Sequence, residues 1–124
     1  MNEVKESDKW KTPTWLMEVF KDYYDPVPPD HSEDYITSLN IPKGNLYINP
    51  PYSDPLPFVL KGIEQHKKFG IIVIFLLKMD SSTKWYKALV DANAHFLYFA
   101  ERLHYSDSKD SPPFSSILAI LNNK

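Results

Sequence analysis

The stretch Ile71-Ile72-Val73-Ile74-Phe75-Leu76-Leu77 decides the fold of this chain. Its seven consecutive apolar residues, several of them β-branched, predict a strand that is covered on both faces. Such a strand lies inside a sheet and not at its edge, because both of its faces need apolar neighbours. It is therefore expected to be the central strand.

Two helices and a short strand are predicted before it. Thr12 is suited to cap a helix whose first residue is Pro13, and apolar residues follow at helical spacing. Residues 45–48 predict a short strand that ends at the prolines after it. Asp54-Pro55 then caps a second helix, and Gly70 marks its end.

A third helix and two strands are predicted after it. Ser81 or Ser82 caps the helix, which carries Trp85 on its apolar face. Residues 94–99 predict the next strand, and residues 116–121 predict the last one. The alternation of strands and helices predicts an α/β fold with a mostly parallel sheet and helices on both faces.

In a sheet of this kind, ligands bind beyond the carboxyl ends of the strands. Tyr52, Asp80 and Arg102 each lie just past a predicted strand. The functional residues are therefore expected at this edge, with Asp80 interpreted as a loop acid and not as a second polar group near a substrate.

Length and composition restrict the class of protein. The chain has 124 residues, of which 43% are hydrophobic and 24% charged, which suits one domain with its own core. It has no cysteine, which excludes a disulfide framework and a cysteine nucleophile, and its four histidines have no metal-ligand spacing. No apolar run approaches the ~18 residues of a membrane span, and the charged start is unlike a signal peptide, so a cytoplasmic protein is expected.

The charge limits how the chain could bind nucleic acid. Its 14 basic and 16 acidic residues give a formal net charge of -2, and Arg102 is the one arginine. The non-specific electrostatic contribution to nucleic-acid binding should be weak. Useful affinity would have to come from a pocket.

The strongest local signal is Asn49-Pro50-Pro51-Tyr52, at the end of a predicted strand. Two successive prolines hold a rigid turn, and the Asn49 amide and the Pro50 carbonyl can both accept from an exocyclic amine. Two such acceptors pull the lone pair of a purine amine out of conjugation and favour its attack on a methyl donor. Tyr52 offers a face for stacking; alternatively, the segment is a strand terminator followed by an amphipathic tyrosine.

With these residues in view, the sequence resembles the phage-type DNA adenine-N6 methyltransferase family, a branch of the S-adenosylmethionine-dependent, Rossmann-like methyltransferases. The matching pieces run in the family's order across most of the chain. They are Trp10-Lys11-Thr12-Pro13, Asp25-Pro26, Asn49-Pro50-Pro51-Tyr52-Ser53, Pro57-Phe58, Leu76-Leu77, Ser81-Ser82-Thr83-Lys84-Trp85-Tyr86, Glu101-Arg102-Leu103-His104-Tyr105 and Pro112-Pro113.

The resemblance implies a compact Rossmann-like methyltransferase fold, mostly parallel, with a C-terminal antiparallel strand. It implies one minimal domain over residues 1–124, of which residues 1–9 are expected to be flexible. The activity implied is methyl transfer from S-adenosylmethionine to the N6 amine of adenine in DNA, with no metal. The target base would leave the helical stack to reach the site.

The resemblance also carries over roles for individual residues. The catalytic set is Asn49, Pro50, Pro51 and Tyr52. The cofactor-binding set is Trp10, Thr12, Pro13, Asp25 and Asn49. The substrate-binding set is Tyr52, Ser53, Thr83, Trp85 and Arg102.

Each of several residues in these sets also has a structural interpretation. Trp10 could be a core anchor, and Asp25 a turn residue before proline. A serine cap with a core-facing Trp85 accounts for most of residues 81–86. Arg102 could grip a phosphate or the cofactor carboxylate, or pair on the surface with Glu101 or Asp107.

The sequence departs from the family pattern at one point. Related amino-methyltransferases place a glycine-rich loop after an Asp-Pro pair, but here Asp25-Pro26 is followed by Val27-Pro28-Pro29-Asp30, and the next glycine is Gly44. The cofactor could be held differently, with Asp25, Asp30 or a neighbouring acid accepting from its amine or hydroxyls. Alternatively, the chain binds the cofactor weakly or is a homologue that has lost it.

Other functions remain open from the sequence. The same Asn-Pro-Pro-Tyr geometry suits an RNA base or a glutamine side-chain amide. A catalytically silent binding module is an alternative of another class. Sequence-specific recognition would need a homodimer, a partner subunit or short loops, and a viral origin would place the protein in the host cell cytoplasm.

Overall fold

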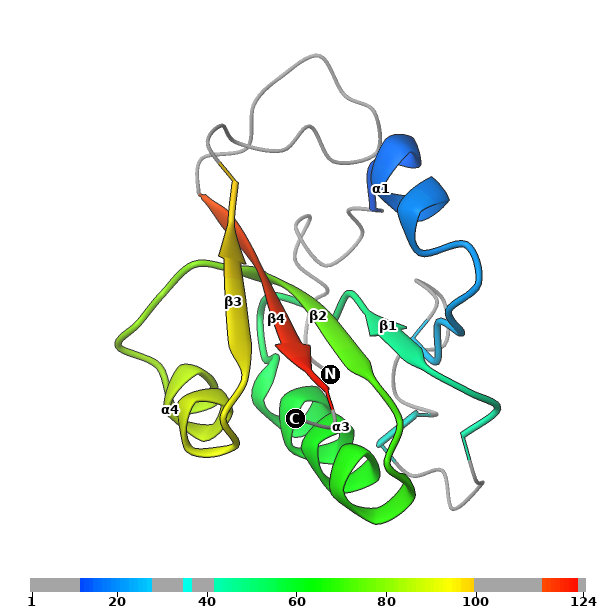
Figure 1. Ribbon diagram of the computed structural model, residues 1–124. Helices are drawn as coiled ribbons and strands as arrows, with labels where there is room; N and C mark the ends of the chain where they lie inside the picture. The colour runs from blue at the N-terminus through cyan, green and yellow to red at the C-terminus, as the bar shows by residue number, and fades with distance from the viewer. Residues whose placement is uncertain (1–11, 28–34, 37–41, 100–114, 123–124) are drawn as a thin grey trace, which may run out of the picture.

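The computed structural model describes residues 12–27, 35–36, 42–99 and 115–122 as one four-stranded sheet with helices packed against it (Figure 1). The helices are α1 Thr14–Val19, α3 Leu56–Phe69 and α4 Lys84–Asp91. The strands are β1 Leu46–Ile48, β2 Val73–Lys78, β3 His95–Tyr98 and β4 Ser116–Leu121, in the spatial order β1-β2-β4-β3.

The sheet is mixed, and most of its pairings are antiparallel. β1 pairs with β2 in parallel, whereas β4 is antiparallel to both β2 and β3. The expectation of a mostly parallel sheet is therefore wrong, because β4 inserts between β2 and β3 and turns two of the three pairings antiparallel. The expected antiparallel direction of the last strand is confirmed.

Three strands nevertheless run in the same direction. β3 is antiparallel to β4, which is itself antiparallel to β2, so β3 points the same way as β1 and β2. Their carboxyl ends lie at one edge of the sheet, where Lys78 is paired with Ser116 and Tyr98 with Ile117. The residues that follow β1 and β2 therefore emerge at a common edge.

The predicted central strand is confirmed. All residues from Val73 to Leu77 in β2 are buried, and β2 lies between β1 and β4. Phe75 belongs to the cluster that includes buried residues of α3 and α4, whereas Ile74 and Leu76 pack with Leu16 of α1. Helices therefore cover both faces, as the alternating pattern predicts.

The ends of the helices are only partly as expected. Gly70 does end α3, in the left-handed conformation with φ of 67°. α1 has Pro13 and not Thr12 at its N-cap, because the Thr12 hydroxyl bonds to side chains of the sheet. Asp54 does not cap α3, whose N-cap is Pro55 and has no side-chain cap bond.

The N-cap of α4 is Thr83 and not Ser81 or Ser82. Asp80 accepts hydrogen bonds from the main-chain N–H and the hydroxyl of Ser82, so the serines belong to a turn before the helix. In the part of the chain that the structure describes, no helix is long and apolar enough to cross a membrane.

α3 approaches β2 closely at Gly62. This glycine is buried, and a Cβ built on it would lie within 2.9 Å of Phe75 Cε1, with Val73 Cγ1 at 3.2 Å. Phe75 and Val73 are fully buried. The absence of a side chain at position 62 therefore sets the distance between α3 and the central strand.

We expect Gly62→Ala to lower the melting temperature. Overpacking a core costs about 1–3 kcal/mol, and over most of this range the cost exceeds the gain of about 1 kcal/mol in helix propensity. The measurement is thermal unfolding followed by circular dichroism. Lys67→Ala, at an exposed position of the same helix, is the control; a variant G62A as stable as the wild type would contradict the close approach.

Candidate active site

The Asn49-Pro50-Pro51-Tyr52 segment leaves the sheet at the edge where the parallel strands end. It follows Ile48, the last residue of β1, and Pro50 is buried while Pro51 is half-buried. Neither proline can donate a main-chain hydrogen bond, so the strand ends here. The segment is thus a rigid turn whose first proline is buried in the protein.

The Asn49 side chain is hydrogen-bonded to a side chain that lies 37 residues earlier in the sequence. Its Nδ2 donates to Thr12 Oγ1 at 3.2 Å, and the same Oγ1 lies 3.2 Å from the Tyr47 hydroxyl oxygen. The amide nitrogen therefore points to Thr12, and the amide oxygen occupies the opposite end of the group. An acceptor for an exocyclic amine uses this oxygen end of an amide.

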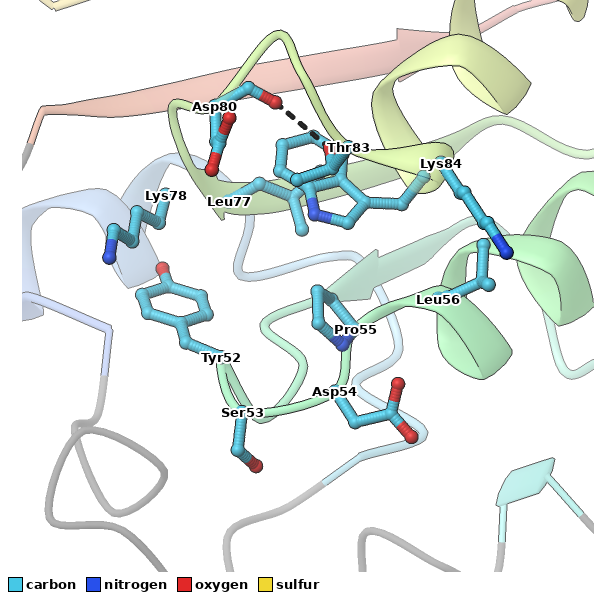
Figure 2. Close-up of a pocket in the computed structure, with 11 residues that line it drawn as sticks. Tyr52, Ser53, Asp54, Pro55, Leu56, Leu77, Lys78, Asp80, Thr83 and Lys84 are labelled. Atoms are coloured by element: carbon cyan, nitrogen blue, oxygen red, sulfur yellow. Dashed lines mark hydrogen bonds between the residues drawn. The ribbon is translucent and has the colours of Figure 1, made fainter.

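Tyr52 forms one wall of a cavity. Its ring is half-buried against the sheet face that α1 covers, and its hydroxyl donates to the main-chain oxygen of Leu76 at 3.4 Å. Figure 2 shows the ring on the opposite side of the cavity from Lys84, the first residue of α4. A tyrosine held at its tip in this way presents its ring to the cavity.

The cavity lies between the end of β2 and the first residues of α3 and α4. Its volume is about 360 Å³, which is within the range of small-molecule sites. Tyr52 and Asp80, which the sequence predicts at one edge, both line it (Figure 2). Its lining consists of Tyr52, Ser53, Asp54, Pro55, Leu56, Leu77, Lys78, Asp80, Thr83, Lys84 and Trp85.

Three of the predicted substrate-binding residues line this cavity, and they differ in exposure and in hydrogen bonding. Ser53 is exposed. Thr83 Oγ1 donates to the Asp80 carbonyl at 2.9 Å and accepts from the Tyr86 N–H at 3.3 Å, which is the bonding of a helix cap. Trp85 is 6% exposed and belongs to the core.

Asp80 is bound within its own loop. It is exposed, and its hydrogen bonds with Ser82 lower the pKa of its carboxyl below the usual range. The carboxylate therefore holds the turn that leads into α4, which agrees with its interpretation as a loop acid. Asp80 and Asp54 place two acidic side chains on a cavity lining that also carries Lys78 and Lys84.

Asp25 reaches the same edge from another segment. Tyr24 forms a parallel bridge with Leu46, so the chain after Tyr24 runs alongside β1 toward the edge where Asn49 lies. Asp25 Oδ1 accepts from the Val27 N–H at 2.9 Å. Asp25 is exposed as a residue, but desolvation of its carboxyl by the surrounding protein raises the pKa of that group, against the lowering effect of the Val27 hydrogen bond.

The structure brings together part of the predicted site. Thr12 and Asn49 are hydrogen-bonded, and Pro13 beside them is buried. Trp10 and Arg102 lie outside the described residues. Among the described residues, no group of three or more histidine, aspartate or glutamate side chains could hold a metal ion.

Sequence reasoning missed two features of the site. Tyr47, whose hydroxyl lies against Thr12, has no signal apart from its place in a short strand just before the motif. Lys78 could have been found as the polar residue that ends the apolar strand, at the edge where ligands bind.

The comparisons with known proteins agree with this geometry. The family model described as DNA N-6-adenine-methyltransferase (Dam) matches residues 31–121. The chain belongs to this family. The match includes the Asn49–Tyr52 turn and all four strands of the sheet, and it confirms the resemblance seen in the sequence.

A curated relative has the same description. The DNA N-6-adenine-methyltransferase of Haemophilus phage HP1 (strain HP1c1) is 31% identical to this chain over an alignment of 112 residues; the alignment covers 77% of this chain and 65% of the relative. The chain thus spans slightly less than two thirds of the length of that relative. No solved structure matches the chain.

The raised pKa of Asp25 predicts a pH-dependent stability difference. Below the pKa of the unfolded state, the carboxyl is protonated in both the folded and the unfolded chain, so burial has no electrostatic cost. As the pH rises through the higher pKa of the folded state, the carboxylate must be formed in a desolvated place, and the folded state loses stability. Asp25→Asn keeps an oxygen for Val27 and removes that cost. We therefore expect D25N to gain stability relative to the wild type between pH 3 and pH 7.

Melting temperatures across this pH range, at constant ionic strength, test the prediction. Asp22→Asn, at an exposed position three residues earlier, controls for the loss of one negative charge. A D25N difference that does not grow with pH, or that equals the difference for D22N at each pH, would show that Asp25 is not desolvated.

Proposed function

We propose that this chain transfers the methyl group of S-adenosylmethionine to the exocyclic N6 amine of adenine in DNA. The observation that carries the proposal is the anchored Asn49 amide at the carboxyl end of β1, followed by two prolines and by the Tyr52 ring that lines the cavity. Membership of the DNA N-6-adenine-methyltransferase family supports the same activity.

The turn would hold the target amine through two acceptors. The Asn49 amide oxygen and the Pro50 carbonyl accept from the two N–H groups, which draws the nitrogen lone pair out of the purine ring and toward the methyl group. Tyr52 would stack on the base in the cavity. A base in duplex DNA must first leave the helical stack, at a cost of a few kcal/mol.

The residues at this edge fit the chemistry of the methyl donor. S-adenosylmethionine supplies a methyl group on a sulfonium, with an ammonium, a carboxylate and ribose hydroxyls as its polar groups. The Asp25 carboxylate suits an ammonium or hydroxyl group, and Thr12 and Pro13 border the same turn. The resemblance adds Trp10 to this set.

The way the cofactor is held differs from the glycine-rich pattern. No glycine lies between Asp25 and Gly44, so side chains would replace the close backbone approach that glycine permits. Transfer would be a single in-line displacement, in which positioning supplies most of the rate, and the amine proton would leave to water. No residue would form a covalent intermediate.

DNA would be held at the rim of the cavity. Lys78 and Lys84 line the rim and suit the phosphates beside an extruded nucleotide. The net charge of -2 keeps the non-specific affinity low. Arg102 as a phosphate or carboxylate ligand, a homodimer as the source of sequence recognition and action in the cytoplasm of a host cell are further parts of the proposal.

We expect Asn49→Ala to lower the methyl-transfer rate by about 10²–10³-fold, because one of two charge-stabilising acceptors is lost. Cofactor affinity should be largely kept, since Thr12, Pro13 and Asp25 remain. The assay measures transfer of a tritiated methyl group from S-adenosylmethionine to DNA, followed by digestion and identification of N6-methyldeoxyadenosine. Unchanged activity of a folded N49A variant would refute the assignment of the turn.

Tyr52 provides a matched pair of variants. Tyr52→Phe keeps the ring and should retain most activity, whereas Tyr52→Ala removes about 1–3 kcal/mol of stacking and should raise the KM for DNA. Label found in RNA or in protein glutamine, and not in DNA, would assign the same chemistry to another substrate. No transfer to any of the three would favour the silent binding module.

A further inference from the structure

Two hydroxyl groups, those of Thr12 and Tyr47, lie close to the Asn49 amide. Thr12 Oγ1 accepts from Asn49 Nδ2, and the Tyr47 hydroxyl oxygen lies 3.2 Å from Thr12 Oγ1. Asn49, Thr12 and Tyr47 thus form a chain of side-chain hydrogen bonds from the turn into the core. Nothing in the family comparison assigns a role to Tyr47.

The Tyr47 side chain, which belongs to this series of hydrogen bonds, is held firmly in place. Its residue is 5% exposed, and its ring is stacked on Phe20 with a centroid distance of 5.0 Å and an interplanar angle of 20°. Its backbone is held from both sides, since it pairs with Ile74 in β2 and its N–H donates to the Tyr24 carbonyl at 3.0 Å. The hydroxyl therefore occupies a defined position.

The backbone next to Thr12 is fixed by the first hydrogen bonds of α1. The carbonyl of the next residue, Pro13, accepts from the N–H groups of Leu16 and Met17 at 3.1 and 3.0 Å. Pro13 is itself buried. Thr12 therefore reaches the sheet from an anchored backbone, which explains why its hydroxyl bonds to Asn49 and not to the end of α1.

The hydrogen bond to Thr12 distinguishes the two ends of the Asn49 amide. The two ends of an asparagine side chain have almost the same shape, so packing alone does not distinguish them. Thr12 Oγ1 accepts from Asn49 Nδ2, and the hydrogen bond between the Thr12 and Tyr47 hydroxyls can run in either direction. In the arrangement in which Thr12 donates, its proton is engaged by Tyr47. Without the tyrosine hydroxyl, Thr12 can instead donate to an amide that has rotated by 180°, which turns the nitrogen toward the target amine.

We infer that Tyr47 is a positioning residue, which acts through Thr12 to keep the oxygen of Asn49 directed at the amine to be methylated. The inference rests on the proposed function of the turn. It assigns to Thr12 a second task beside its place in the cofactor-binding set. A rotated amide would present a donor to the N–H groups of the substrate and would not stabilise the developing charge.

Tyr47→Phe tests the inference, because it removes the hydroxyl and keeps the ring that stacks on Phe20. We expect kcat to fall roughly 10- to 100-fold, while the KM values for S-adenosylmethionine and for DNA change by less than about twofold. Tyr23→Phe, which removes a hydroxyl from the same aromatic cluster, is the matched control and should retain wild-type kcat. Y47F with the kcat of the wild type would overturn the inference.

Thr12 supplies an independent pair of variants. Thr12→Val keeps the shape and loses the hydroxyl, whereas Thr12→Ser keeps the hydroxyl. A fall of kcat in T12V that T12S restores supports the hydrogen-bonded chain. An equal fall in both variants would indicate a packing role for the residue and would overturn the inference, and this holds even where Y47F is too unstable to assay.

A measurement without substrate separates this inference from the proposed function. The side-chain NH₂ signals of Asn49 in a ¹H–¹⁵N spectrum, assigned by their loss in Asn49→Asp, should shift in Y47F and T12V but not in Y23F. Signals that stay in place in both Y47F and T12V would overturn the inference. A wild-type protein without transfer activity, but with the expected shifts, would leave the hydrogen-bonded chain intact and refute only the methyltransferase proposal.

Discussion

The burial of β2 between β1 and β4 is the constraint on which the rest of the structure depends. A strand with both faces covered needs a hydrogen-bonded neighbour on each side, because unpaired main-chain groups are costly away from water. β1 and β4 supply these neighbours. On one face Gly62 lets α3 lie directly against Phe75, and on the other face Leu16 of α1 packs against Ile74 and Leu76.

The same constraint places the site. Since β1 is parallel to β2, the turn after β1 and the residues after β2 emerge at one edge, where Tyr52 of the turn and Asp80 line the same cavity. α1, which covers the second face, brings Thr12 to Asn49. The orientation of the proposed catalytic amide therefore depends on the packing of a six-residue helix that is far from it in sequence.

The parts of the fold that the sequence predicts are those that depend on local chemistry. The run from Ile71 to Leu77, the end of α3 at Gly70 and the turn at Asn49 each follow from one residue type or one short pattern. The insertion of β4 could not be read in the same way, because strand order depends on long-range pairing. Threonine often caps helices, so the sequence predicts that role for Thr12, but the contacts of its hydroxyl with Tyr47 and Asn49 exist only in the folded chain.

The central claim is that this edge of the sheet holds S-adenosylmethionine without a glycine-rich loop. The most direct test is calorimetric titration of the purified, folded protein with S-adenosylmethionine and with S-adenosylhomocysteine. The account predicts saturable binding of both ligands at one site, weakened in D25N and in T12V. An absence of binding at millimolar ligand would contradict it and would make the missing glycines the sign of a homologue that no longer uses the cofactor.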